Sequence, residues 1–291
     1  MFLWCPRPSA GLEGAGRSSG NRGCGQFTKQ TDGKGDRLLS ADFPDSHQAL
    51  ILVPDQAPPA SADLQGTGSP APSTDVKVVC LTYNANIFDV RNIDEARRII
   101  LTDEGSTTDE RWNSETPYLA DAIHQTLHIT PETVLIDYGC GIGRMAKELI
   151  QRHGCRVIGV DISNNMRALA PSYVQSSRFL ACSPEMLDAM VARNFVADAA
   201  ISIWVLQHCL KPAEDIERIH RALVPGGGLF VLNNLYRAVP TREQAWANDG
   251  LDIKALVRDR FSLEMEGKPS DEQTPPALRD IIFWAKFLKS R

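Results

Sequence analysis

The stretch V-L-I-D-Y-G-C-G-I-G-R-M-A-K-E-L-I, Val134–Ile150, decides the fold of this chain of 291 residues. An apolar run ends at Asp137, and Gly139, Gly141 and Gly143 follow at alternate positions before a helix-like pattern begins. Glycine lets a turn bend tightly and lets a ligand approach the backbone without a Cβ atom in the way. A helix that opens after such a turn directs its free N–H groups at the ligand. We therefore predict a strand, a ligand-binding turn and a helix, with each of the three glycines facing the ligand.

The chain after Pro131 alternates between short apolar runs and amphipathic segments. The predicted strands are 134–137, 156–161, 178–182, 198–204 and 228–233, and the predicted helices are 143–153, 163–170, 185–193 and 212–223. Apolar strands interleaved with amphipathic helices indicate a parallel sheet that is covered on both faces. Two more apolar runs, 261–266 and 283–289, are joined by a segment with no long helix. This short connection predicts that the last two strands pair antiparallel.

The first part of the chain has a different composition. Residues 1–75 hold nearly half of the 21 glycines and 18 prolines of the chain, with many serines between them. Their one apolar run, Leu50–Val53, is too short to offset the entropy of ordering such a segment. A helix capped by Asp94 and running to Leu101 is predicted further on. We expect a disordered, low-complexity extension (1–75) that need not belong to the working protein, an N-terminal helical cap (76–130) and an α/β domain (131–291).

Composition restricts the partners and the compartment. The net charge is −5, whereas a surface that binds duplex nucleic acid usually carries a basic excess, so nucleic acid is disfavoured. The seven cysteines, without C-x-x-C pairs, indicate buried free thiols in a reducing compartment rather than disulfides or a metal cluster. No apolar run approaches the length of a membrane span, and the apolar start lacks the features of a secretory signal. We therefore expect a cytoplasmic protein with no bound metal and no membrane partner.

Two classes of cofactor fit a glycine turn of this kind. The dinucleotide pattern G-x-G-x-x-G/A fails when it is counted from Gly139 but passes from Gly141, with Ala146 in third place. Asp137 favours the second class, because a carboxylate at the strand end repels a pyrophosphate and attracts an ammonium group, such as that of S-adenosylmethionine. Asp161 ends the second strand, where either cofactor class places its ribose hydroxyls. Its competing role is to cap the following helix.

Four motifs in this order carry a resemblance to a known family: D-Y-G-C-G-I-G, V-I-G-V-D-I-S, D-A-A-I-S-I-W-V-L-Q-H-C and L-V-P-G-G-G-L-F-V-L. Together they resemble the class I S-adenosylmethionine-dependent methyltransferases over about Pro131–Asn233. The last two strands are similar to the antiparallel hairpin of that family. The resemblance implies a doubly wound α/β fold with helices on both faces of a mostly parallel, seven-stranded sheet, in which one strand is reversed.

The resemblance also implies which residues hold S-adenosylmethionine. Asp137 and the turn backbone hold the methionine part, Asp161 holds the ribose, and Ile162 packs on the adenine. After the third strand this chain lacks the aspartate that often binds the adenine amino group. The backbone of Cys182 and Ser183, or the Ser183 hydroxyl, is the expected substitute. The predicted cofactor-binding residues are Asp137, Tyr138, Gly139, Cys140, Gly141, Gly143, Asp161, Ile162, Cys182, Ser183 and Trp204.

The acceptor side is less sharply defined by the sequence. Gln207 and His208 follow the fourth strand and are expected near the transferred methyl group. His208 is equally well explained as a catalytic base or as a hydrogen-bonded structural residue, and positioning without a base can supply much of the rate of a methyl transfer. Trp112 and Trp246 lie in aromatic, charged segments that flank the core. Each is either a contact to the acceptor or a packing anchor.

The sequence thus predicts an enzyme that transfers a methyl group from S-adenosylmethionine by in-line displacement. The segment W-V-L-Q after the fourth strand lacks the (D/N)-P-P-Y and Pro-Cys patterns of nucleic-acid methyltransferases. A small molecule is therefore the first choice of acceptor and a protein side chain the second. Two alternatives stay open at this point: an NAD(P)-dependent oxidoreductase, and a non-catalytic cofactor-binding protein of the same fold.

Overall fold

A computed structural model of the chain describes residues 28–31, 37–40, 48–54, 76–99, 108–243, 246–269 and 279–290. None of the helices in this described part is both long and apolar enough to cross a membrane.

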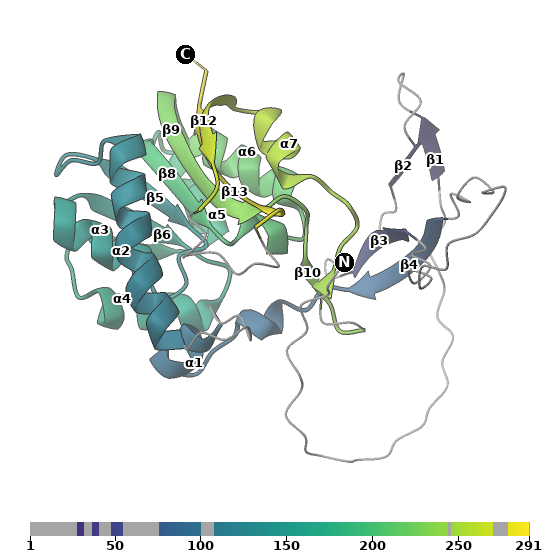
Figure 1. The fold of residues 1–291 in the computed structure, drawn as a ribbon, viewed down its shortest axis with the longest axis horizontal. Coiled ribbons are helices and arrows are strands. Elements are labelled where there is room, and N and C mark those ends of the chain that lie inside the picture. The colour runs from purple at the N-terminus through teal and green to yellow at the C-terminus, as the bar shows by residue number, and fades with distance from the viewer. Residues whose placement is uncertain are drawn as a thin grey trace, which may run out of the picture.

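A seven-stranded sheet forms the centre of the molecule, in the strand order β12-β13-β9-β8-β5-β6-β7 (Figure 1). Its strands are β5 (Val134–Tyr138), β6 (Arg156–Val160), β7 (Phe179–Cys182), β8 (Ala197–Ile203), β9 (Leu223–Asn234), β12 (Ser262–Gly267) and β13 (Ile282–Leu288). Strands β5 to β9 pair in parallel, whereas β13 lies antiparallel to both β9 and β12. The predicted mostly parallel sheet with an antiparallel C-terminal pair is confirmed.

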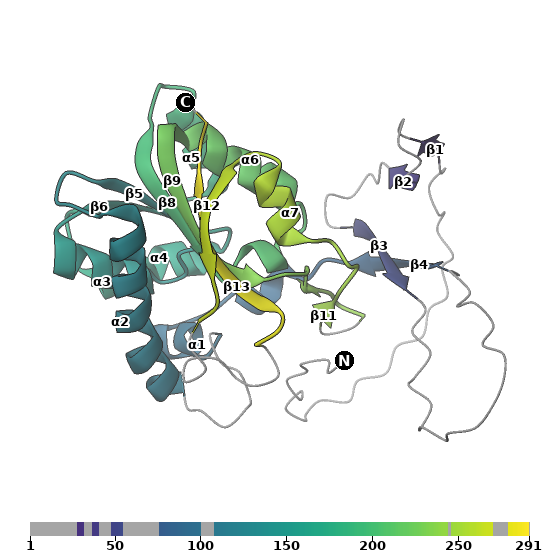
Figure 2. The same cartoon turned by 45° about the horizontal axis from the view of Figure 1, so that its top comes forward.

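Helices cover both faces of this sheet (Figure 2). They are α2 (Thr108–Leu127), α3 (Arg144–His153) and α4 (Asn164–Val174) on one face, and α5 (Pro184–Val191), α6 (Pro212–Ala222) and α7 (Ile253–Arg258) on the other. Successive side chains of a strand point to opposite faces. Leu135 therefore packs in the same core as Leu149 of α3, and Ile136 in the same core as Ile216 of α6. Asp137 follows in turn and faces the α2 and α3 side.

Helix α2 belongs to the main core. Its residues Leu119, Ala120 and Ile123 are buried together with Leu135 of β5 and Leu149 of α3. The predicted helical cap over 76–130 therefore contributes a layer of the α/β domain through this helix.

The first helix has a different register from the predicted one. Helix α1 spans Ile93–Arg98, and the side chain of Asn92 caps it by accepting a hydrogen bond from the Glu95 backbone N–H. The prediction of Asp94 as the cap is wrong, because Asp94 lies in the first turn of the helix. Asparagine and aspartate cap about equally well, so the local sequence did not distinguish the two registers. The predicted end at Leu101 lies outside the described residues.

The N-terminal region contains strands where composition predicts disorder. They are β1 (Thr28–Thr31), β2 (Arg37–Ser40) and β3 (Gln48–Pro54), and the rest of residues 1–75 lies outside the described part. Strand β3 contains the one apolar run of the region and pairs antiparallel with β4 (Val76–Thr82) along its length. Pairing satisfies the backbone groups of such a run. Whether this region belongs to the working protein stays a prediction.

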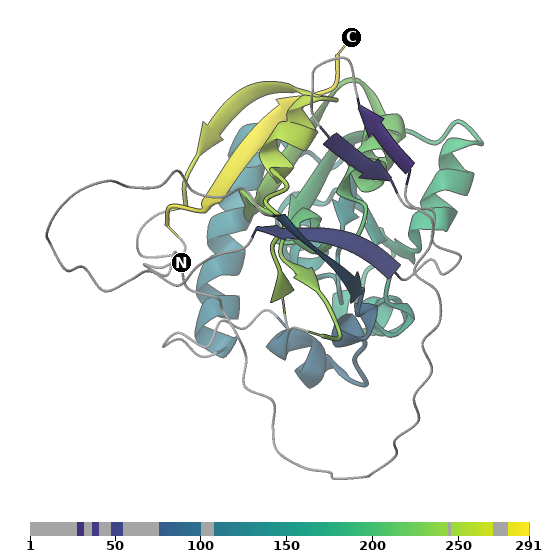
Figure 3. The same cartoon turned by 90° about the vertical axis from the view of Figure 1, so that its right-hand side faces the viewer.

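The chain after β4 docks on the segment that follows β9. The Asn84 N–H donates to the Pro240 carbonyl over 2.9 Å, and the Arg242 N–H donates to the Thr82 carbonyl over 3.0 Å. Figure 3 shows β3 and β4 beside the small strands of this segment, β10 (Val239–Pro240) and β11 (Trp246–Ala247). This contact brings residues 82–88 to the carboxyl end of the sheet.

Candidate cofactor and active site

The three glycines of the turn differ in what surrounds them. All adopt positive φ angles: +80° at Gly139, +55° at Gly141 and +87° at Gly143. A Cβ atom at Gly139 would lie 2.1 Å from Val205 Cγ2, and one at Gly143 would lie 2.5 Å from Val174 Cγ2. A Cβ atom at Gly141 would meet a single atom, at 3.9 Å. Gly139 and Gly143 thus make room for neighbouring side chains of the protein, and a contact of their backbone to the cofactor stays a prediction.

Asp137 lies beneath this turn with one oxygen unsatisfied. The residue is 3% exposed, and its Oδ2 atom is buried without a hydrogen-bond partner in the described part of the chain. Burial raises the pKa of Asp137 to about 7. The positive charge of Arg144 opposes this rise, whereas the negative charge of Asp161 adds to it. A buried acceptor without a partner is costly. The site therefore fits a ligand that brings a cationic hydrogen-bond donor to Oδ2.

Asp161 braces the turn from the end of β6. Its Oδ2 accepts a hydrogen bond from the Gly141 N–H over 2.8 Å, and its Oδ1 accepts one from the Ser163 N–H over 2.8 Å. Burial raises the pKa of this carboxyl, and these two hydrogen bonds oppose the shift. Because a carboxylate oxygen has two lone pairs, each oxygen keeps one for a ribose hydroxyl. The cap of α4 is the Ser163 side chain, which accepts from Met166, so Asp161 is not needed as a helix cap.

Asp161→Ala is expected to weaken the binding of S-adenosylmethionine by about 1–3 kcal/mol, the scale of lost hydrogen bonds to a charged group. Calorimetric titration of the folded variant measures this change. Ser163→Ala removes the cap of α4 and keeps the carboxylate, so it serves as the control for loosening of the turn. Unchanged affinity in Asp161→Ala would refute the ribose role.

Large apolar side chains are exposed beside Asp161. Ile162 is 52% exposed, and Met186, in the first turn of α5, is 54% exposed. They follow the ends of the adjacent strands β6 and β7, where a flat adenine ring would lie in this fold. The Ser183 hydroxyl accepts from the Met186 N–H as the cap of α5, and Cys182 is buried. The Cys182 carbonyl accepts from the Asp161 N–H, and the Ser183 carbonyl accepts from the Leu187 N–H. Contacts of these two residues to the adenine therefore stay a prediction, and sequence reasoning missed Met186.

Two further turn residues, Tyr138 and Cys140, have side chains that interact within the protein. The Tyr138 side chain points to the α6 side, where its hydroxyl donates to Asp215 over 2.5 Å and accepts from Arg218 over 3.0 Å. The Cys140 thiol is buried, and burial raises its pKa well above the ordinary value. The Cys140 N–H donates to the Val160 carbonyl, and the Cys140 carbonyl accepts from the Gly143 N–H. A backbone contact of this segment to the cofactor stays a prediction.

A buried network that sequence reasoning missed closes the site on the α2 side. Glu115 of α2 accepts from Arg144 Nη1 over 2.9 Å and from Trp204 Nε1 over 3.1 Å. Glu115 and Arg144 are both buried. Trp204 has a φ of +61°, a conformation that costs energy outside glycine and concentrates at functional sites. The helix α2, the first turn of α3 and the bend after β8 are thus held together beside Asp137.

Both ring nitrogens of His208 have partners within the protein. Nδ1 donates to the Ala238 carbonyl over 2.7 Å, and Nε2 lies 3.1 Å from Gln207 Nε2. Gln207 Oε1 accepts from the Asn234 N–H, which turns the amide nitrogen toward His208 and leaves Nε2 of the ring as the acceptor. Burial lowers the pKa of His208 to about 4, although the bond to Ala238 opposes this shift. The ring is therefore neutral at neutral pH, and its lone pair is occupied, which favours the structural explanation.

Both predicted tryptophans are packed against other side chains. Trp112 is 7% exposed and lies between two guanidinium groups, with its ring centre 5.2 Å from Arg97 Cζ and 5.4 Å from Arg144 Cζ. The Trp246 ring lies 4.7 Å from the His208 ring. Each acts as an anchor, and a role for either in binding an acceptor stays a prediction.

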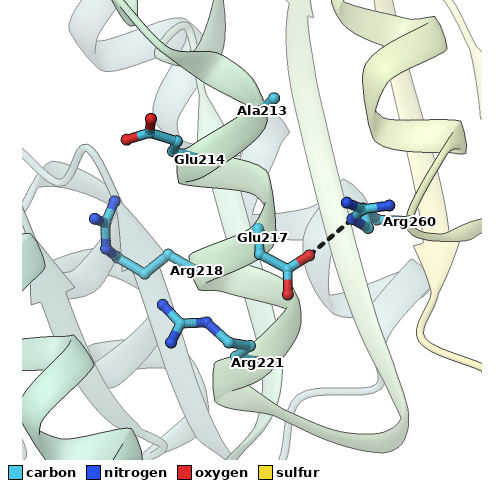
Figure 4. Close-up of a pocket in the computed structure, with 6 residues that line it drawn as sticks. All are labelled: Ala213, Glu214, Glu217, Arg218, Arg221 and Arg260. Carbon is cyan, nitrogen blue, oxygen red and sulfur yellow. Dashed lines mark hydrogen bonds and ion pairs between the residues drawn. The ribbon is translucent and has the colours of Figure 1, made fainter.

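A hollow of about 410 Å³ lies elsewhere, on the outer side of α6 (Figure 4). It is lined by Ala213, Glu214, Glu217, Arg218, Arg221 and Arg260. Arg260 pairs with Glu217, and Arg218 and Arg221 both pair with Asp188. The hollow is on the opposite side of the sheet from Asp137 and takes no part in the site.

Comparison with known proteins identifies the glycine-turn domain. A family profile described as a methyltransferase domain matches residues 136–231, which run from the middle of β5 through β8 to most of β9. The matched domain is a methyltransferase domain of the class I S-adenosylmethionine-dependent type. The residues of the site fit the cofactor of this family. The free Asp137 oxygen suits its ammonium group, the open space at Gly141 suits its amino-acid end, and the Asp161 carboxylate suits its ribose. No group of three or more potential metal ligands occurs among the described residues.

Three curated relatives illustrate the similarity. The chain is 37% identical over 106 residues to N-demethylindolmycin N-methyltransferase of Streptomyces griseus, covering 34% of this chain and 43% of that protein. It is 32% identical over 163 residues to carboxy-S-adenosyl-L-methionine synthase of Pseudomonas putida, a match that covers 50% of this chain and 66% of that protein. It is 29% identical over 103 residues to phosphoethanolamine N-methyltransferase 2 of Caenorhabditis elegans, a match that covers 35% of this chain and 24% of that protein. The chain spans about half the length of the curated relatives that it matches.

Proposed function

We propose that this chain binds S-adenosylmethionine at the carboxyl end of β5 and transfers its methyl group to a small molecule. The observation that carries the proposal is the buried, unpartnered Oδ2 of Asp137 beneath the open backbone of Gly141. An ammonium group satisfies that oxygen, whereas the pyrophosphate of a dinucleotide would be repelled by it. The oxidoreductase alternative is therefore not favoured.

The residues around the site act by holding and positioning. S-adenosylmethionine, when bound, would supply a methyl group on a sulfonium, whose sulfur leaves when a nucleophile attacks the methyl carbon in line. Asp137 and Asp161 hold two ends of the cofactor, and the Glu115 network fixes Trp204 as a wall that excludes water. Alignment of the reacting atoms provides the main acceleration. His208 positions the loop after β9 through Ala238 and is not required as a base.

The choice of a small-molecule acceptor has two supports. Two of the relatives are named as methyltransferases of small molecules, one for N-demethylindolmycin and one for phosphoethanolamine. The net charge of −5 also disfavours a nucleic acid. A protein side chain remains the second choice.

Calorimetry and mass spectrometry test the proposal. S-adenosylmethionine is expected to bind the full chain, and NADH and NADPH are not. Incubation with S-adenosylmethionine and a panel of small amines, phenols and carboxylic acids should then produce S-adenosylhomocysteine together with an acceptor that has gained one methyl group. Binding of NADH or NADPH in place of S-adenosylmethionine would favour the oxidoreductase.

The same mass spectra separate two other outcomes. The similarity to a carboxy-S-adenosyl-L-methionine synthase makes the cofactor itself a possible site of modification. A heavier form of S-adenosylmethionine without S-adenosylhomocysteine would show that kind of activity and contradict methyl transfer. Tight binding with no product from any member of the panel would support the non-catalytic alternative.

A further inference from the structure

Asn234, the last residue of β9, has a buried side-chain oxygen without a partner. Its Oδ1 atom makes no hydrogen bond to any of the residues that the structure describes. The polar groups around it are satisfied: the Asn234 N–H donates to Gln207 Oε1 over 2.8 Å, and the Asn234 carbonyl accepts from Asn233 Nδ2 over 2.9 Å. A buried oxygen without a partner destabilises a fold, so its presence indicates a use in binding.

The register of the sheet places this oxygen on the cofactor side. Asp137 pairs with Ile201, Ile201 pairs with Phe230, and Phe230 lies four residues before Asn234 on β9. Paired residues and residues at even spacing share one face of a sheet. The side chains of Asn234 and Asp137 therefore lie on the same face, the one that α2 and α3 cover.

The strand between them ends early. β8 leaves the sheet after Ile203, where Trp204 takes its positive φ. Ile203 is the last residue of β8 paired with β9, opposite Leu232, so Asn234 extends beyond the end of its neighbour. The carboxyl edge thus presents Asp137 on β5, Trp204 after β8 and Asn234 on β9 in that order. A ligand that begins at Asp137 and crosses this edge meets Asn234 at its far end.

We propose that Asn234 Oδ1 accepts a hydrogen bond from the N–H or O–H group of the methyl acceptor and thereby orients its attacking atom. The inference rests on the proposed methyl transfer and narrows the acceptor to an amine or a hydroxyl compound. An amide oxygen accepts only, so it holds the proton of the acceptor and leaves the lone pair of the attacking atom directed at the methyl group. A bond forms between nitrogen or oxygen and the methyl carbon, the carbon–sulfur bond breaks with its electron pair left on sulfur, and the proton passes to water.

Two variants of Asn234 test the role. Asn234→Leu has a similar size and lacks the acceptor, whereas Asn234→Asp keeps oxygens that accept. Because Asn234→Leu removes an unsatisfied buried oxygen, its melting temperature should equal or exceed that of the wild type. A residue with a purely structural role would show a lower melting temperature on the same change.

Binding of paired probes provides the second readout. Aniline against N,N-dimethylaniline and phenol against anisole are pairs in which one member lacks the N–H or O–H donor. Each is titrated into the full chain saturated with S-adenosylhomocysteine and followed by ligand-observed NMR. The member with the donor should bind the wild type about three- to tenfold more tightly, the worth of one hydrogen bond. Asn234→Leu should abolish this preference, and Asn234→Asp should retain it.

The outcomes separate this inference from the function on which it rests. Failure of S-adenosylhomocysteine to bind the wild type would contradict the proposed function itself. Normal binding of S-adenosylhomocysteine with no preference for the donor in the wild type, including no binding of any probe, would overturn the role of Asn234. So would a preference that survives in Asn234→Leu, or a lowered melting temperature of that variant.

Discussion

Asp137→Asn is expected to weaken the binding of S-adenosylmethionine and S-adenosylhomocysteine about tenfold to a hundredfold. The change keeps the shape of the side chain and removes the charge that pairs with the ammonium group, and hydrogen bonds to charged groups contribute about 1.5–3 kcal/mol. A nicotinamide dinucleotide carries no such ammonium, so its binding should change little or improve. Titration of the folded variant with both ligands by calorimetry measures the difference. Undiminished binding of S-adenosylmethionine would break the link between Asp137 and the cofactor.

The pH dependence of binding is the second signature of Asp137. In the free protein its pKa is raised to about 7 by burial, and only the ionised form pairs with an ammonium group. Affinity for S-adenosylmethionine should therefore fall as pH decreases below about 7, by up to tenfold for each pH unit. Binding near neutral pH should release protons, which titrations in buffers of different ionisation enthalpy detect. Asp137→Asn should lose the part of the pH dependence and of the proton release that comes from this carboxyl.

The stability of the free protein should change in the opposite direction. Because the folded pKa of Asp137 lies above its ordinary value of 3.8, the native state binds more protons than the unfolded state between about pH 4 and pH 7. The contribution of this group to the free energy of unfolding therefore falls as pH rises through that window, by up to about 4 kcal/mol. At neutral pH Asp137→Asn should melt at a higher temperature than the wild type. A lower melting temperature would indicate a structural role for the charge.

Substitutions at Gly139 and Gly141 are expected to fail in different ways. Gly139→Ala places a Cβ atom 2.1 Å from Val205 Cγ2, so it should destabilise the fold by about 2–5 kcal/mol through overpacking and the positive φ. Gly141→Val extends into open space and should fill the place of the amino-acid end of the cofactor. Thermal unfolding should show that Gly141→Val is folded, with a free energy of unfolding lower by about 1–2 kcal/mol because valine is strained at this positive φ. Calorimetry should show that the variant no longer binds S-adenosylmethionine.

Val205→Ala provides the matched control. It removes the two methyl groups nearest to the added Cβ, so it should partly restore the stability of Gly139→Ala and leave the binding defect of Gly141→Val unchanged. Equal loss of stability at both glycines would show that Gly141 also serves packing. Retained cofactor affinity in Gly141→Val would show that the turn at Gly141 does not contact the cofactor.

Local sequence was sufficient for the sheet and for the position of the glycine turn. The apolar run that ends at Asp137 and the helix after Gly143 are readable because strand and helix have different periods of apolar residues. The register of α1 was missed because Asn92 and Asp94 are both good caps. The antiparallel pairing of β12 and β13 followed from the absence of a long connection between them.

Sequence by itself thus determined the order of elements, the glycine turn and the two carboxylates, Asp137 and Asp161, at the strand ends. Only the tertiary structure decided that Gly139 and Gly143 serve packing, because Val205 and Val174 come from distant parts of the chain. It alone brought Glu115 onto Arg144 and Trp204, occupied both ring nitrogens of His208, and left Oδ1 of Asn234 unpartnered. The physical reason is that hydrogen bonding and packing of a side chain depend on partners far along the chain, whereas periodicity and turn chemistry depend on near neighbours.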